Sequence, residues 1–172
     1  MNKAIYTESD ITQTGAQLIL CSVSLDGTIA NIAEQKFKRA FPDAYATMLS
    51  MLNAPVEDKL KARLGDVIWV TTSGNRHIGF GIVKKSCTEA INTKALKLIM
   101  KSAREKAKAL QKEYVGMDLF ASDTPQEWAA IVGIIETELK EIQAVVCIPT
   151  NDALMKVLEA LPGEKTFRAI QG

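Results

Sequence analysis

The residues that could do chemistry gather in two polar segments, 22–29 and 120–126, each of which follows an apolar run and precedes a helical pattern. Small, hydroxyl and carboxylate residues fill them: Ser22, Ser24, Asp26, Gly27 and Thr28 in the first, and Ser122 and Asp123 in the second. In sheets built from strand–helix units, ligands bind where strands end and helices begin, because unpaired helix amides face that edge. These two loops are therefore the expected ligand-binding site.

The sequence contains few residues that suit nucleophilic catalysis or metal binding. Cys21, Cys87 and Cys147 form no close pair, and His77 is the only histidine. Such a set cannot supply a conventional zinc site, so we expect no metal and no cofactor. No Asp or Asn is evident that would orient His77 beside Cys21, which favours a buried strand thiol over a nucleophile. Phosphate-loop and nucleophile-elbow motifs are absent from the sequence.

The bulk composition is that of a globular protein. The chain has 172 residues, of which 47% are hydrophobic and 24% charged, and its net charge is +1. This length predicts one domain, residues 1–172, and the charge gives no field that would attract a nucleic acid or an anionic membrane. No apolar stretch of about 18 residues is present, and no leader peptide is expected in the polar first ten residues. The odd number of cysteines indicates a reducing compartment, so we expect a cytoplasmic protein.

Strand and helix patterns alternate along the chain. Short apolar runs predict strands at residues 4–7, 17–22, 65–71, 76–83, 115–120, 144–148 and 166–170. Stripes of period 3.6 predict helices at residues 29–40, 43–52, 92–113, 124–142 and 151–161, with a surface connection over 53–63. The lysines of the helix at 92–113 fall on one face, which is most simply its solvent side. This alternation predicts a three-layer α/β/α fold with a mixed, mostly parallel sheet.

The opening of the chain resembles a macro domain, the fold that usually binds ADP-ribose. The resemblance begins with Ser9-Asp10-Ile11-Thr12, continues through the apolar strand ending at Ser24, and then through Gly27 to the Phe-Lys-x-x-Phe-Pro-like run 37–42. It covers most of residues 3–148 and is similar to the compact branch found in bacteria and their phages. Residues 149–172 add a terminal helix and an edge strand.

The resemblance implies an adenine-binding role for Asp10 and Ile11. In the family, the aspartate accepts from the exocyclic amine of adenine, and the amide of the next residue reaches a ring nitrogen. The alternative from the residues alone is that Asp10 only caps a turn, as aspartate often does.

The sequence departs from the family at the ribose and phosphate positions. Cys21-Ser22-Val23-Ser24 stands where the family has Asn-x-x-Asn, and a serine hydroxyl offers fewer hydrogen bonds than an amide. Only Gly27 remains of the first glycine-rich loop, and 120–126 replaces the second. Asp26 ahead of one helix and Ser122 or Asp123 ahead of the other can cap the helix amides themselves. The carboxylates would then repel a diphosphate by about 1 kcal/mol or more per close pair.

Lys84 and Lys85 follow the strand expected at 76–83, where some members of the related branch carry a functional lysine. The simpler expectation is a solvated pair at a strand end.

Three functions follow from these residues. The leading hypothesis is a module that binds ADP-ribose or another adenine nucleotide derivative, with weak or absent catalysis. The second is an ADP-ribosyl hydrolase in which Ser24, Asp26 or Lys84 would be catalytic. The third is a protein-interaction domain with a degenerate pocket, which keeps the fold and binds no nucleotide.

Overall fold

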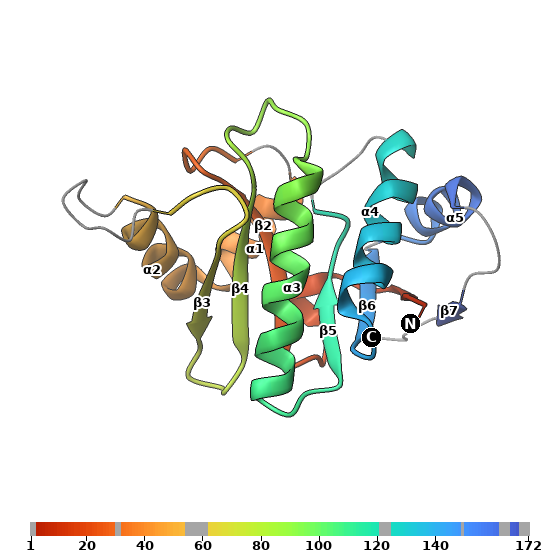
Figure 1. The fold of residues 1–172 in the computed structure, drawn as a ribbon, viewed down its shortest axis with the longest axis horizontal. Helices are drawn as coiled ribbons and strands as arrows, with labels where there is room; N and C mark the ends of the chain where they lie inside the picture. The colour runs from red at the N-terminus through yellow and green to blue at the C-terminus, as the bar shows by residue number, and fades with distance from the viewer. Residues whose placement is uncertain are drawn as a thin grey trace.

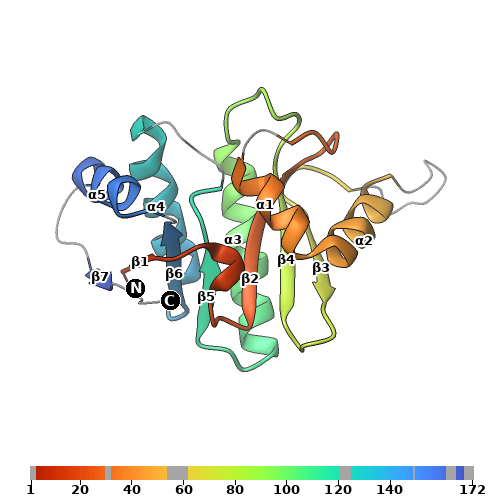
Figure 2. The same ribbon diagram turned by 180° about the vertical axis from the view of Figure 1, so that it is seen from behind.

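The computed structural model describes residues 3–29, 32–53, 62–120, 125–148, 150–161 and 166–168. Its seven strands form one sheet in the order β3-β4-β2-β5-β6-β1-β7 (Figures 1 and 2). They are β1 (Ile5–Glu8), β2 (Leu18–Ser24), β3 (Val67–Thr71), β4 (His77–Lys84), β5 (Tyr114–Met117), β6 (Gln143–Ile148) and β7 (Thr166–Arg168). The β3–β4 pair is antiparallel and every other pair is parallel. The prediction of a mixed, mostly parallel sheet is confirmed.

Helices cover both faces of the sheet. They are α1 (Ile32–Ala40), α2 (Pro42–Leu52), α3 (Thr93–Ala109), α4 (Pro125–Leu139) and α5 (Asn151–Ala160), and a short 3-10 helix, η1 (Ile11–Gln13), follows β1. Figure 1 shows α3 and α4 in front of the sheet, and Figure 2 shows α1 and α2 on the opposite side. Two hydrophobic clusters, one on each side of the sheet, form the core. The layers are therefore α/β/α, as the alternating pattern predicted.

Strand β2, inside the sheet, shows why a continuous apolar run predicts a strand in this fold. All seven residues of β2 are buried. A parallel strand between two helical layers has no solvent face, and so its sequence is a continuous apolar run instead of an alternating one.

The helix boundaries differ from the prediction, since α3 ends at Ala109 instead of 113 and α4 at Leu139 instead of 142. The second helix, predicted over 43–52, begins one residue earlier, at Pro42, and its N-cap is Phe41, which makes no side-chain capping bond. Proline suits the first helical position because its missing N–H would have had no partner there. The apolar stripe that predicts α3 includes Leu98, but Leu98 is 52% exposed. The other apolar residues of the stripe from Ala95 to Ala107 are buried, and the lysine-rich face points to solvent.

Candidate functional site

The parallel strands bring the predicted site residues to one edge of the sheet. β1, β2, β4, β5 and β6 all end there, at the upper edge in Figure 1. β2 contributes Ser24, β4 contributes Lys84, and Asp10 follows β1. Residues 121–124, which include Ser122 and Asp123, lie outside the described residues. The carboxyl edge is thus where the candidate side chains from distant parts of the chain meet.

The loop after β2 is tied to the segment after β4. Its four successive amides all donate within the protein: Leu25 to the Lys84 carbonyl (2.9 Å), Asp26 to the Lys85 carbonyl (3.0 Å), Gly27 to the Ser24 carbonyl (3.0 Å) and Thr28 to Asp26 Oδ1 (3.0 Å). Gly27 has a φ of +78°, which a glycine adopts without strain. None of these four amides is free for a phosphate, so this stretch is not the amide cradle that a glycine-rich loop provides.

The Asp26 carboxylate caps this loop. Its Oδ1 accepts from both the amide and the hydroxyl of Thr28, the latter at 2.6 Å, and the Thr28 hydroxyl accepts from the amide of Cys87 at 2.9 Å. These bonds, first of all the one from the Thr28 hydroxyl, lower the pKa of Asp26 below its usual value. The side chain is exposed and carries its negative charge at neutral pH. Asp26 therefore caps a turn of the loop at Thr28, and the prediction that it caps the amides of the following helix is wrong, because α1 begins at Ile32.

Lys84 is buried, contrary to the expectation of a solvated pair. Its side chain is 5% exposed, whereas Lys85 beside it is exposed. Lys84 stands opposite Ser24 across β4 and β2, where a register shift interrupts the parallel pairing. The Ser24 hydroxyl is fully buried and has no hydrogen-bond partner. No ion pair or hydrogen bond joins the Lys84 ammonium to another described residue. A buried hydroxyl without a partner among the described residues is costly unless a ligand completes it.

Glu34 is a buried acid that the sequence analysis missed. It lies in the first turn of α1, is 4% exposed, and accepts from the Ser22 hydroxyl at 3.3 Å. The available signal was helical spacing, because Glu34 lies three residues before the buried Phe37 and therefore on the same face of α1. A buried carboxylate requires hydrogen-bond donors inside the protein, and the Ser22 hydroxyl is one of them.

Asp10 is the N-cap of η1. Its Oδ1 accepts from the amide of Thr12 at 2.9 Å and from the Thr12 hydroxyl at 2.8 Å. Ile11, the next residue, is 6% exposed and packs in the core beneath α1 and α2. The turn-capping role is thus present. It engages one carboxylate oxygen, and no hydrogen bond to a described residue engages the other.

Cys21 does not form a catalytic pair with His77. Cys21 pairs with Phe80 of β4, whereas His77 begins that strand and bonds to the hydroxyl of Thr71 at 3.1 Å. Burial, with the charges of Asp118 and Glu34, raises the pKa of the Cys21 thiol well above its usual value. The thiol therefore stays protonated. No group of three or more potential metal-binding side chains occurs among the described residues.

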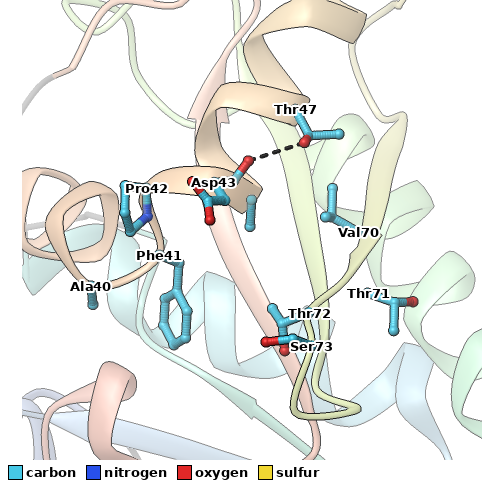
Figure 3. A pocket seen from close by; sticks show the side chains of 10 residues that line it. Ala40, Phe41, Pro42, Asp43, Thr47, Val70, Thr71, Thr72 and Ser73 are labelled. Atoms are coloured by element: carbon cyan, nitrogen blue, oxygen red, sulfur yellow. Dashed lines mark hydrogen bonds between the residues drawn. The ribbon is translucent and has the colours of Figure 1, made fainter.

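A separate cavity of about 330 Å³ lies at the edge of the sheet where the parallel strands begin (Figure 3). It is lined by the α1–α2 junction, including Phe41 and Asp43, and by the end of β3, including Thr71 to Ser73. Because β3 is antiparallel to β4, this end of the sheet is opposite the carboxyl edge. The cavity contains none of the site residues predicted from the sequence.

Comparison with known proteins identifies the fold. No family model and no curated protein matches the sequence. The structure is similar to the macrodomain of Thermus aquaticus DarG (TM-score 0.70, 14% identity, 86% of this chain and 100% of that chain). It is also similar to a macrodomain protein from Streptomyces coelicolor (TM-score 0.70, 16% identity, 84% and 98%). A third similar structure is Thermosipho africanus DarTG in complex with ADP-ribose (TM-score 0.70, 13% identity, 91% and 45%).

The fold is therefore a macrodomain fold, with a sequence that has diverged far from the solved examples. The resemblance in the opening residues predicted this correctly. No described helix is both long and apolar enough to cross a membrane.

Proposed function

We propose that this protein binds ADP-ribose or another adenine nucleotide derivative at the carboxyl edge of its sheet. Two observations carry the proposal: the Lys84 side chain is largely buried and has no ion-pair partner among the described residues, and the buried Ser24 hydroxyl has no hydrogen-bond partner among them. A lysine without a counter-ion at this edge fits an anionic ligand, because the ligand would supply the opposite charge.

The adenine end of the ligand is assigned to Asp10 and Ile11. One oxygen of the Asp10 carboxylate caps η1 and the other is left to accept from an exocyclic amine. This assignment agrees with the macrodomain fold and with the ADP-ribose bound in the Thermosipho africanus structure. It places adenine beyond β1, two strands from β5 in the sheet order, with the phosphates and the second ribose toward β2 and β4.

The phosphate end of the site differs from an amide cradle. The amides of residues 25–28 are engaged internally, and the charged Asp26 carboxylate sits in that loop. Lys84 is then the main group that favours a phosphate, and Asp26 opposes it. We expect ADP-ribose to bind more weakly than to a glycine-rich site, and a less charged adenine ligand to bind comparably. Ser22, Ser24, Gly27 and Thr28, with Ser122 and Asp123, complete the proposed binding residues, and Cys21 contributes packing.

Isothermal titration with ADP-ribose, AMP and adenosine tests the proposal. Binding of ADP-ribose that is lost in Asp10→Ala supports it. If adenosine or AMP binds and ADP-ribose does not, the pocket accepts adenine ligands that carry fewer charges than ADP-ribose. No heat with any of the three ligands would reject the proposal and leave a protein-interaction domain with a degenerate pocket.

An ADP-ribosyl hydrolase is the second candidate, and the position of Lys84 at the carboxyl edge favours it. A lysine at that edge could contact the reacting group of a bound substrate. Asp26 fits catalysis less well, because its lowered pKa makes it a weak base and it is already bonded to Thr28. Ser24 has no neighbouring base among its described contacts. Turnover of an ADP-ribosylated protein that is abolished by Lys84→Met would establish this function. Equal rates for wild type and for the Ser24, Asp26 and Lys84 variants would exclude it.

A further inference from the structure

Strand β3 forms one end of the sheet, and its five residues lack charges and prolines, two features that often protect an edge strand. Its sequence is Val-Ile-Trp-Val-Thr over Val67–Thr71, and a bulge at Gly65 and Asp66, which both bond to Ile82 of β4, precedes it. Natural proteins guard exposed edges with such features because an open edge pairs readily with another strand. An unguarded edge of β-branched and aromatic residues therefore indicates a surface that another strand covers.

The backbone of β3 is arranged for such pairing. In an antiparallel pair, residues alternate between those bonded to the neighbouring strand and those whose amide and carbonyl point away. Thr72 bonds to Arg76, and Asp66 to Ile82, which places the even-numbered residues on the β4 side. The amides and carbonyls of Val67, Trp69 and Thr71 therefore point outward, and no described residue bonds to them.

A groove of about 590 Å³ follows this edge and receives side chains from both helical layers. Met51 of α2 and Ile68 line it from one layer, and Leu98 of α3 and Trp69 line it from the other. Met51 and Leu98, at 49% and 52% exposed, are two of the four exposed large apolar side chains among the described residues. A strand laid along β3 would alternate its side chains between these two walls. The groove is thus shaped for strand addition.

We infer that the occupant is β3 of a second copy of this chain, paired antiparallel about a two-fold axis at Trp69. Trp69 is the middle residue of the five, and it is one of the outward-facing residues, so the two copies would exchange bonds at this position. Such an arrangement is self-complementary and closed, as a two-fold dimer requires. It would join the two sheets into one and cover Leu98 and Met51 of both copies.

The charges at the groove fit a second copy. α3 packs over β4, and so the two α3 helices would run antiparallel about three strand spacings, or about 14 Å, apart. Trp69 Nε1 donates to the Ser102 hydroxyl at 3.2 Å. Because the proposed two-fold axis passes through Trp69, Ser102 lies beside that axis. Lys101 and Glu105 both line the groove and are both exposed. Antiparallel helices crossing near Ser102 would place Lys101 of one copy opposite Glu105 of the other, within reach of long side chains.

The test is the concentration dependence of the molar mass, measured by sedimentation equilibrium from about 1 to about 200 µM. A reversible dimer is expected. Leu98→Glu should raise its dissociation constant at least tenfold. Met155→Glu, an equivalent change at a 49% exposed side chain of α5 outside the groove, should leave it unchanged. Circular dichroism and a thermal melt confirm that both variants are folded.

Charge reversal provides a second test that leaves the apolar residues intact. Lys101→Glu and Glu105→Lys should each weaken the dimer, and the double variant should restore it, because the opposed pair is recreated with the charges exchanged. A wild-type protein that stays monomeric throughout would overturn the proposal, leaving the edge to a strand of a different protein. A dimer that Leu98→Glu does not weaken, or that Met155→Glu weakens equally, would overturn it as well.

Discussion

Ser24 and Lys84 are strand partners across β2 and β4, at a break in the strand register. Up to Val23 the strands pair residue by residue, and Ser24 then pairs with Lys84, passing over Val83. Val83 packs in the cluster formed with α3 and α4, and the Lys84 side chain is 5% exposed. A local irregularity thus makes a largely buried lysine the strand partner of a buried serine.

Lys84→Met should separate the stability of the protein from its affinity for anions. Methionine keeps the length and the burial of the side chain and removes its charge, so the free energy of unfolding should not fall by more than about 0.5 kcal/mol. The same change should weaken ADP-ribose binding at least tenfold, about 1.4 kcal/mol, and should leave adenosine binding unaltered. Urea denaturation and isothermal titration measure the two effects.

Lys85→Met is the matched control for this variant. It removes the same charge at the neighbouring residue, which is exposed, and should change neither stability nor affinity appreciably. Loss of ADP-ribose binding in Lys85→Met, or normal binding in Lys84→Met, would contradict the assignment.

Asp10→Asn should distinguish adenine recognition from turn capping. An asparagine oxygen can accept the two bonds from Thr12 that Asp10 Oδ1 now accepts, so stability should stay within about 0.5 kcal/mol of wild type. The second oxygen becomes an NH₂ group, which cannot accept from the adenine amine. Adenosine and ADP-ribose should both bind at least tenfold more weakly. Asp10→Ala should in addition lower the free energy of unfolding by about 1 kcal/mol, through loss of the cap. Unchanged binding by Asp10→Asn would leave Asp10 as a cap alone.

The sequence predicted the sheet well because the strand signal is local. β2, β4 and β6 are short apolar runs between turn residues, and their burial on both faces makes the pattern clear even without alternation. Helix ends were less certain. Pro42 and Asp43 are both suited to the first turn of α2, and only the chain path decides which residue begins it.

The site was harder to predict because its key features depend on distant contacts. Lys84 has the pattern of an ordinary strand-end lysine, and its burial depends on the loop after β2, whose amides bond to the Lys84 and Lys85 carbonyls. Glu34 was overlooked because its partner Ser22 lies in another element. Leu98 lies on the apolar stripe of α3, but it packs against the glycine at position 65, ahead of β3, and is 52% exposed.

Asp26→Asn should strengthen the binding of charged ligands. Asparagine can still accept from Thr28 and hold the loop, but it removes the negative charge. If Asp26 opposes the phosphates by about 1 kcal/mol, ADP-ribose should bind about fivefold more tightly. AMP should gain less and adenosine nothing.

The pH dependence follows from the direction of the pKa shift. The pKa of Asp26 is lowered, so the charged form persists above the ordinary value of about 4 and is lost only below it. Titration of Asp26 should therefore cause no change in affinity between pH 6 and 8, the range in which calorimetry would be run. Weaker ADP-ribose binding by Asp26→Asn would show that the carboxylate holds the loop open instead of opposing the ligand.

Alkylation should distinguish the three cysteines in the native state. Burial raises the pKa of Cys21 and Cys147, and the two thiols are 4% and 2% exposed, whereas Cys87 is partly exposed. The thiolate is the reactive form, so iodoacetamide at pH 8 should modify Cys87 alone, and all three thiols in denaturant. Peptide mass spectrometry identifies the modified residue, and Cys87→Ser should abolish native labelling. Native labelling of Cys21 would mean that β2, the strand leading to Ser24, opens to solvent, and the buried Ser24–Lys84 pair could not then persist.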